Sequence, residues 1–341
     1  MRIQSWAKGA LIALAIAMVG VTAHAGTLED VQSAGVLKCG INTGLPGFAQ
    51  TDDDGNWIGF DVAYCRALAA AVLGDPTAIQ FVNLTGANRF PALQSGEIDV
   101  LSRNTTWTLS RDVDLGLTFV GVNYYDGQGF IGRRALGVMS ATELDGASVC
   151  IQTGTTTELN LADFFRSNNM SYEPVPIETN AEARAAYEAE RCDVYTTDAS
   201  GLAATKATFD DPDAHIVYPE IVSKEPLGPL VRHGDDQWAD VARWVLNALI
   251  IAEELGVSQG NVERLAAGTD HPEINRMLGS EGSYGEMLGL DAQWAVRAIA
   301  AEGNYAEIFD RYIGPDTKLG LQRGLNALYK DGGILYAPPF R

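Results

Sequence analysis

The chain has 341 residues, of which 44 are Asp or Glu and 24 are Lys or Arg, giving a formal net charge of -20 at pH 7. A surface this acidic repels phosphate backbones, and no basic stripe offsets it, which argues against a nucleic-acid partner. The length exceeds what one hydrophobic core usually supports, so two domains are expected.

The first 25 residues have the pattern of a secretory signal peptide. Arg2 and Lys8 precede the apolar run "ALIALAIAMV" (10–19), and "AHA" stands just before Gly26. A charged start, a short apolar region and a small-x-small site predict cleavage after Ala25. The apolar run is too short for a membrane span, which needs about 20 residues. We therefore expect an exported protein that is soluble in the periplasm.

From residue 36, strand-like and helix-like segments alternate. "VLKCGI" (36–41), "IQFVNL" (79–84) and "IDVL" (98–101) read as strands, separated by helical patterns over 60–74 and 87–96. Alternating strands and helices are typical of a parallel sheet covered by helices. The order recurs in 147–198, where "CIQTG" resembles the earlier "CGINTG" and "CDVYTTD" resembles "IDVLSRN". The sequence thus predicts two α/β lobes of similar build.

Two linkers define the predicted domain organisation. "YYDGQGF" (124–130) leaves the first lobe and "KEPLGPLV" (224–231) returns to it. We expect lobe 1 to contain 26–125, lobe 2 to contain 126–224, and 225–341 to return to lobe 1. Helical patterns over 235–256 and 291–314, the second broken at Gly303, would pack against that lobe.

Cys39, Cys65, Cys150 and Cys192 all lie in the exported part, where disulfides form readily. Three connectivities are possible. The two-lobe organisation favours one bridge per lobe, Cys39 with Cys65 and Cys150 with Cys192. No C-x2-4-C pair is present, so no metal site is expected.

The common catalytic and cofactor motifs are absent, apart from one formal match. "GQGFIG" (127–132) satisfies G-x-G-x-x-G, but no helix opens cleanly within it, as a dinucleotide site requires. We interpret this segment as a hinge. G-x-S-x-G, H-E-x-x-H and Walker A sequences do not occur.

Polar clusters follow the predicted strands, where open α/β sheets bind ligands. Arg111 has the forked charge that suits a carboxylate, although it could simply pair with Asp112 or Asp114. Asp198 could hold an ammonium or cap the helix that follows it. "TGTTTE" could present backbone N–H groups to an anion or form a capping box of Thr155 with Glu158. A carboxylate receptor and an ammonium acceptor together match an amino-acid zwitterion.

Longer segments resemble a known family. These are "NRFPALQSGEIDVLSRNTTWTLSR", "CIQTGTTTELN", "SKEPLGP", "GNYAEIFDRYIG" and "GGILYAPPFR". They are similar to the polar amino-acid binding proteins of ABC importers (extracellular solute-binding proteins, family 3), within them to those that serve glutamate, glutamine, aspartate and asparagine. The resemblance implies the two-lobe type II periplasmic-binding-protein fold, no cofactor, an inner-membrane ABC permease as partner and a monomer.

The resemblance also implies roles for individual residues. Arg111 is expected to bind the α-carboxylate of the ligand, together with Thr106 and with Thr155 or Thr156. Asp198 is expected to bind its ammonium, together with Asn104. Side-chain contacts are expected from Arg89, Gln152, Arg103 and Asn180. Acidic-substrate relatives have an arginine where this chain has Asn42, so both amides and acids are expected as ligands.

Two other functions are compatible with the same two-lobe fold. A dehydratase-like periplasmic enzyme would need a general acid in the cleft, where Asp198 is already assigned to an ammonium. A receptor's sensor domain would be expected to continue into a span or signalling helix, and this chain ends at "YAPPFR".

Overall fold

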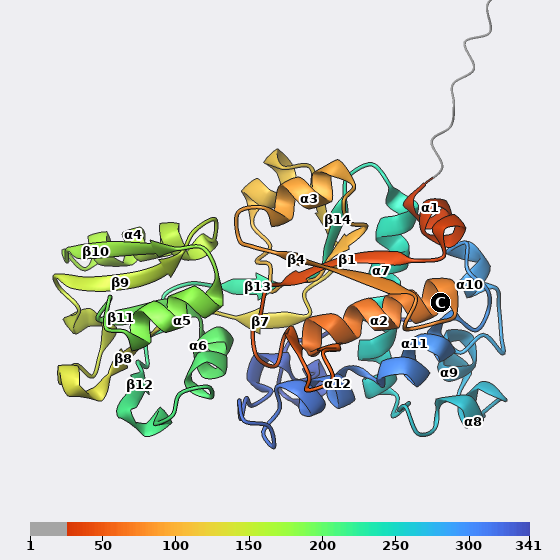
Figure 1. Ribbon diagram of the computed structural model, residues 1–341. Coiled ribbons are helices and arrows are strands. Elements are labelled where there is room, and N and C mark those ends of the chain that lie inside the picture. Colours follow the sequence, from red (N-terminus) through yellow and green to blue (C-terminus); the bar gives the residue numbers. More distant parts are fainter. Residues whose placement is uncertain (1–25) are drawn as a thin grey trace, which may run out of the picture.

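A computed structural model describes residues 26–341. The predicted signal peptide and its cleavage after Ala25 lie outside the described residues. Figure 1 shows two lobes, each built from a sheet covered by helices, with two short strands running between them. The expected two-lobe α/β architecture is therefore confirmed.

The first lobe contains a five-stranded sheet in the order β4-β1-β5-β14-β6. β1 pairs in parallel with β4 and β5. β14, which follows the second lobe in the chain, pairs antiparallel with β5 and β6. The first lobe is therefore assembled from two separate stretches of sequence. The strands are β1 (Leu37–Asn42), β4 (Ile79–Leu84), β5 (Val100–Leu101), β6 (Leu117–Phe119) and β14 (Leu230–Arg232).

Helices cover this sheet, and the predicted ones are confirmed with small shifts of their ends. The 60–74 pattern forms α2, which ends where Gly74 adopts φ 78°, a left-handed conformation that glycine tolerates. The 291–314 pattern is broken at Gly303 as expected. The helices are α1 (Thr27–Ala34), α2 (Phe60–Leu73), α3 (Arg89–Ser95), α7 (Asp236–Glu254), α8 (Val262–Ala266), α9 (Pro272–Met277), α10 (Tyr284–Met287), α11 (Trp294–Glu302) and α12 (Tyr305–Tyr312).

The second lobe repeats the plan with a five-stranded sheet in the order β10-β9-β11-β8-β12. Separate apolar clusters fill its two faces, one around Tyr187 and Leu202 and the other around Leu161 and Phe165. Its strands are β8 (Gln128–Arg133), β9 (Ala147–Gln152), β10 (Tyr172–Ile177), β11 (Val194–Asp198) and β12 (His215–Val217), and its helices are α4 (Thr156–Ser167), α5 (Asn180–Glu188) and α6 (Ala199–Lys206).

Two antiparallel strands link the lobes, β7 (Tyr124–Asp126) and β13 (Glu225–Leu227) (Figure 1). The "GQGFIG" segment continues from β7 into β8, a strand that runs to Arg133 and is followed by a single 3-10 turn, Arg134–Leu136. Because no helix opens within the motif, the dinucleotide-site alternative is excluded. Only its start belongs to the linker; the rest is a strand of the second sheet.

The remaining short elements lie in loops. They are the hairpin β2 (Gln50–Thr51) and β3 (Trp57–Ile58), the π-helix Ser110–Asp114, and the 3-10 turns Ala141–Glu143, Pro212–Ala214, Gly324–Asn326 and Tyr329–Asp331.

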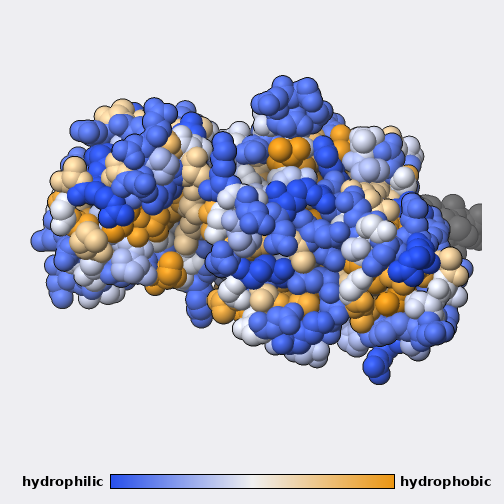
Figure 2. All heavy atoms as spheres, turned by 90° about the horizontal axis from the view of Figure 1, so that it is seen from below, coloured by the Kyte–Doolittle hydropathy of each residue, from blue (hydrophilic) through white to orange (hydrophobic). Residues whose placement is uncertain are grey.

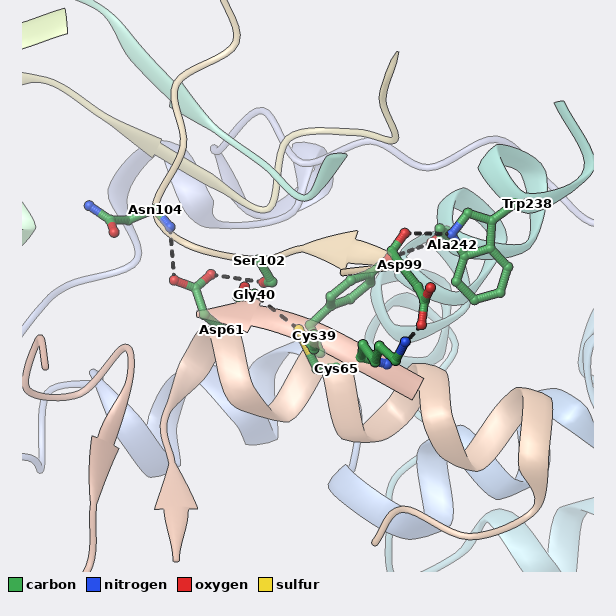
Figure 3. Close-up of a disulfide and its surroundings, with 11 residues drawn as sticks. Cys39, Gly40, Asp61, Cys65, Asp99, Ser102, Asn104, Trp238 and Ala242 are labelled. Atoms are coloured by element: carbon green, nitrogen blue, oxygen red, sulfur yellow. Dashed lines mark hydrogen bonds between the residues drawn. A yellow bond between two sulfur atoms is a disulfide. The ribbon is translucent and has the colours of Figure 1, made fainter. Parts of the chain in front are cut away.

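The favoured disulfide pairing is confirmed. Cys39 on β1 bonds to Cys65 on α2, and Cys150 on β9 bonds to Cys192 in the turn before β11. Figure 3 shows the first bridge joining the strand to the helix beneath it. Each bridge lies within one lobe, so neither restricts movement between the lobes.

The outer surface is largely hydrophilic on the face shown in Figure 2, where apolar residues form separate patches. Within residues 26–341, no helix has the length and apolar character needed to cross a membrane.

Candidate functional site

The predicted site residues meet where the two sheets face each other. Asn42 ends β1, Gln152 ends β9 and Asp198 ends β11, each at the carboxyl end of a strand. A small, partly open cavity lies at this junction. It is lined by Arg89, Arg103, Asn104, Thr106, Gln152, Thr155, Thr156, Thr157, Thr197 and Asp198. Thr157 and Thr197 were not predicted, although both lie in polar clusters visible in the sequence.

Hydrogen bonds cross the cavity from one lobe to the other. The Arg89 Nη2 donates to the carbonyl oxygen of Gly154 at 3.3 Å, and the Asn104 Nδ2 to Asp198 at 3.4 Å. The backbones also meet closely, since a Cβ added at Gly86 would lie 2.5 Å from the Thr153 carbonyl oxygen. The lobes are therefore closed around the cavity, and larger residues at Gly86 would hold them apart.

Arg111 lies against the cavity rather than in its immediate lining. Its Nη1 donates to the Thr106 carbonyl oxygen at 2.9 Å, and its guanidinium lies 5.1 Å from the centre of the Phe90 ring. It is 7% exposed and forms no ion pair with Asp112 or Asp114 within 4.0 Å. The surface ion-pair alternative is thus wrong, because the side chain points inward from its π-helical turn. Burial lowers the pKa of Arg111 to about 10, although the negative charges of Glu225 and Asp198 act to raise it.

Arg89 and Arg103 add two more buried cations with incomplete hydrogen bonding. Arg89 donates to the Thr105 hydroxyl, and Arg103 donates through Nε to the Leu84 carbonyl oxygen. The Arg89 Nε and the Arg103 Nη2 are buried without a partner. Burial, followed by the charges of Arg111 and Arg103, lowers the pKa of Arg89 well below its ordinary value. Unsatisfied buried donors are costly, so each of these two nitrogens favours an added acceptor.

Asp198 supplies the opposite charge. It is 7% exposed and makes no capping bond to α6 through its side chain. Asp126 makes the side-chain contact with the first turn of α6 instead, because its Oδ2 accepts from the Ser200 backbone N–H at 3.3 Å. The capping alternative for Asp198 is therefore wrong. Burial raises its pKa well above the ordinary value, and the nearby carboxylates of Asp126 and Glu225 raise it further. A cation beside Asp198 would relieve this cost.

Asn104 is held in an uncommon backbone conformation with φ 31°. Asp61, in the first turn of α2, accepts from the Asn104 backbone N–H at 2.9 Å and from the Ser102 hydroxyl at 3.1 Å. Figure 3 shows Asp61 directed from the helix toward this loop. Burial raises the pKa of Asp61 to about 6. The buried carboxylate therefore shapes the loop that carries Asn104 into the cleft.

An amide cluster closes one side of the cavity. The Asn42 Nδ2 donates to the Asn104 Oδ1 at 2.9 Å and to the Asn180 Oδ1 at 3.1 Å. Asn42 and Asn180 are both buried, and the bond between them joins the two lobes. Gln152 donates to the carbonyl oxygen of Glu178 at 2.9 Å. Asn42 and Asn180 thus lie behind the lining residues and form a wall of the site.

The capping box of Thr155 with Glu158, one of the two alternatives for this segment, does not form at the start of α4. The Thr155 hydroxyl donates to the Gln152 carbonyl oxygen at 2.7 Å, and Glu158 accepts from the Gly154 N–H at 2.8 Å. Thr155 therefore gives no side-chain cap. The hydroxyls of Thr106 and Thr156, predicted to meet a ligand carboxylate, both donate to Glu225 in this structure. Glu225 was missed by sequence reasoning; the signal available was a lone acid in a Pro- and Gly-rich return linker.

Comparisons with known proteins identify the family and agree with the two-lobe fold. The sequence profile of the bacterial extracellular solute-binding proteins, family 3, matches residues 37–271. The chain is 58% identical to the "Glutamate/glutamine/aspartate/asparagine-binding protein BztA" of Rhodobacter capsulatus over 97% of each chain. It is 56% identical to the "General L-amino acid-binding periplasmic protein AapJ" of Rhizobium johnstonii, over 97% of this chain and 98% of that one. A solved structure, "ABC transporter / periplasmic binding protein from Brucella ovis with glutathione bound", is 55% identical with a TM-score of 0.90, covering 93% of this chain and 100% of that one.

Proposed function

The chain belongs to the bacterial extracellular solute-binding proteins, family 3, and from this premise we propose that it binds polar L-amino acids in the periplasm and delivers them to an inner-membrane ABC permease. Glutamate, glutamine, aspartate and asparagine are the proposed ligands, in line with the name of the Rhodobacter relative. The observation that carries the proposal is the meeting of buried arginines from one lobe with the buried carboxylate of Asp198 from the other, around a small cavity.

The opposed charges match an amino-acid zwitterion. The α-carboxylate is assigned to Arg111 and to the loop and helix start that carry Thr106, Thr155 and Thr156. The ammonium is assigned to Asp198 and Asn104, where the new cation would offset the burial of the carboxylate. Charge-assisted hydrogen bonds of this kind contribute about 1.5–3 kcal/mol each.

The side-chain part of the site is proposed to accept both acids and amides. Arg89 and Arg103 present unpartnered N–H groups that suit a carboxylate or a carbonyl oxygen. Asn42 and Asn180 form the amide wall behind them, and Gln152 lines the cavity. Because these amides carry no charge, the site does not demand an anionic side chain.

Transport follows from closure. We take 26–125 with 225–341, and 126–224, as the two bodies that move about β7 and β13. Contacts to the ligand from both bodies are available together only in the closed form, so the ligand stabilises that form by its differential affinity. The closed monomer would present the surface that the permease recognises. The protein is proposed to break no bond in its ligand and to use no cofactor.

A second candidate ligand is a γ-glutamyl peptide such as glutathione, which the Brucella structure contains. A further cavity of about 270 Å³ lies between the lobes, lined by Asn180, Arg184, Thr43, Trp57 and neighbours. Asn180 is the wall that separates it from the first cavity. A glutamyl group in the first cavity could thus extend a peptide tail toward Arg184 if the Asn42–Asn180 bond opened.

Calorimetric titration of the ligand-stripped protein tests these proposals. The panel is glutamate, glutamine, aspartate, asparagine, leucine and glutathione, with mass analysis of the recovered ligand. Reversible binding of several polar amino acids, returned unchanged, is expected. A chemically altered ligand would favour the enzyme, and no binding across the panel would reject the proposed function.

A further inference from the structure

Glu225 is a buried carboxylate at the crossing between the lobes. It begins β13, which pairs with β7 so that Glu225 lies opposite Asp126. Its exposed fraction is only 1%. Figure 1 shows that these two strands run between the lobes, so Glu225 belongs to the segment about which the lobes would turn.

Four donors surround the carboxylate. Its Oε2 accepts from the Thr106 hydroxyl at 2.5 Å and from the Thr156 hydroxyl at 2.9 Å. Its Oε1 accepts from the Asn160 Nδ2 at 2.7 Å and from the Ser223 hydroxyl at 2.6 Å. No Lys or Arg nitrogen among residues 26–341 lies within 4.0 Å of it. These neutral donors therefore replace the water that an exposed carboxylate would bind.

The donors come from different lobes. Thr106 lies in the loop after β5 of the first lobe, whereas Thr156 and Asn160 lie in the first turns of α4 in the second lobe. The two threonine hydroxyls are 3.5 Å apart. One carboxylate oxygen thus joins both sides of the cleft, and separating the lobes must break at least one of these bonds.

We propose that Glu225 is a positioning residue for closure, which holds Thr106 and Thr156 together across the cleft and stabilises the closed form. Each threonine hydroxyl can donate one hydrogen bond, and in this structure both hydroxyls donate to Glu225. The threonine side chains then act on the ligand indirectly, by setting the distance between the lobes. The ligand carboxylate is received by Arg111 and by backbone N–H groups at the same loop and helix start.

This inference rests on the proposed function in one respect, because it assumes that the closed form holds the bound ligand. It goes beyond that function because it gives Glu225, which does not contact the ligand itself, an indirect effect on ligand binding through Thr106 and Thr156. It also predicts that the closed form is favoured by the protein itself before any ligand binds.

Glu225→Gln is the test variant, because it keeps the size of the side chain while replacing one acceptor oxygen by an NH₂ group. The NH₂ group cannot accept, so the two groups that face it lose their acceptor, and the charge that strengthens all four hydrogen bonds is removed. Glu220→Gln is the matched control, since Glu220 accepts from the Ser140 hydroxyl and the Ala141 N–H, both within the second lobe. Glu225→Asp tests whether a shorter carboxylate restores part of the effect.

Two readouts separate positioning from simple stability. The radius of gyration of the ligand-free protein reports closure by small-angle X-ray scattering, and stopped-flow dissociation of glutamate reports retention of the ligand. For Glu225→Gln we expect a larger ligand-free radius and a dissociation rate raised tenfold or more. Glu220→Gln should change neither the ligand-free radius of gyration nor the dissociation rate, even if its melting temperature falls.

Two results would overturn the inference. An unchanged radius and dissociation rate in Glu225→Gln would leave the residue with a structural role only. Slower dissociation would mean that Glu225 competes with the ligand for the threonine hydroxyls. If the wild-type protein bound none of the amino acids, the proposed function would fail, while the ligand-free scattering comparison would still decide the role of Glu225.

Discussion

At the scale of single residues, the site depends on charges that are buried before a ligand arrives. Arg89, Arg103 and Arg111 lie on one side and Asp198 on the other, all at most 7% exposed. Burial lowers the pKa of the arginines and raises that of the aspartate. A zwitterion bound between them would pair with these charges. The free-energy cost of burying them unpaired would then be relieved on binding, which increases the affinity.

Replacing Arg111 tests the carboxylate assignment. Arg111→Ala should weaken glutamate binding by about 2–5 kcal/mol, because the ligand carboxylate would be buried without its cation. Isothermal titration calorimetry measures this directly. Arg166→Ala, at an exposed ion pair on α4, is the control. Equal affinities in wild type and Arg111→Ala would remove Arg111 from the site.

Replacing Arg103 tests the side-chain assignment. Arg103→Gln removes a buried cation with an unpartnered nitrogen, so affinity for glutamate should fall more than affinity for glutamine. The quantity to measure is the ratio of the two dissociation constants, since a general loss of packing weakens both ligands alike. A ratio that stays at its wild-type value would place the ligand side chain elsewhere.

At the scale of elements, the lobes are stiffened locally and left free relative to each other. The two disulfides each join elements of one lobe, and α7 is fixed to α1 through its own cap. Asp235 accepts from the Trp238 N–H at 3.0 Å and from the Thr27 N–H at 2.6 Å. This helix belongs to the first lobe, and neither it nor its cap lines the small cavity between the lobes.

Removing that cap should affect stability and leave binding unchanged. Asp235→Ala is expected to lower the free energy of unfolding by about 1–2 kcal/mol, because two buried or partly buried N–H groups lose their acceptor. Chemical denaturation measures the change. Asp236→Ala, one residue into the helix, is the control. A fall in glutamate affinity with Asp235→Ala would show that the cap acts on the cleft.

At the scale of the whole molecule, acids from both lobes and the linkers gather around one cleft. Asp126 on β7 lies beside Asp198, and burial raises the pKa of Asp126 to about 6. In the proposed complex, the ligand ammonium beside Asp198 would favour the ionised carboxylate and lower its pKa. Binding would then release a proton wherever the pH lies below the raised pKa of Asp198 in the free protein.

Glutamate affinity should accordingly decrease as the pH is lowered from 8 toward 5. Titrations across this range check the sign, because the ligand itself stays a zwitterion with an ionised side chain throughout. Asp126→Asn removes one neighbouring charge and should move the onset of the decrease to lower pH. Affinity that rises toward acid would contradict the ammonium assignment to Asp198.

Local patterns in the sequence predicted the alternation of strands and helices and the two lobes. They favoured, among three possible connectivities, the pairing of Cys39 with Cys65 and Cys150 with Cys192. The sequence also placed Asn104 and Asp198 near strand ends. These features depend on local periodicity and on the rule that strand ends form ligand sites, both of which are visible in short segments.

Only the tertiary structure decided the partners of those side chains. Glu225 accepts hydrogen bonds from the hydroxyls of Thr106 and Thr156. Asp126, not Asp198, accepts through its side chain from the first turn of α6, and Arg103 keeps an unpartnered nitrogen. The physical reason is that a hydrogen bond requires atoms within about 3 Å. Glu225 is 119 residues from Thr106, and such contacts depend on how the lobes close rather than on any local pattern.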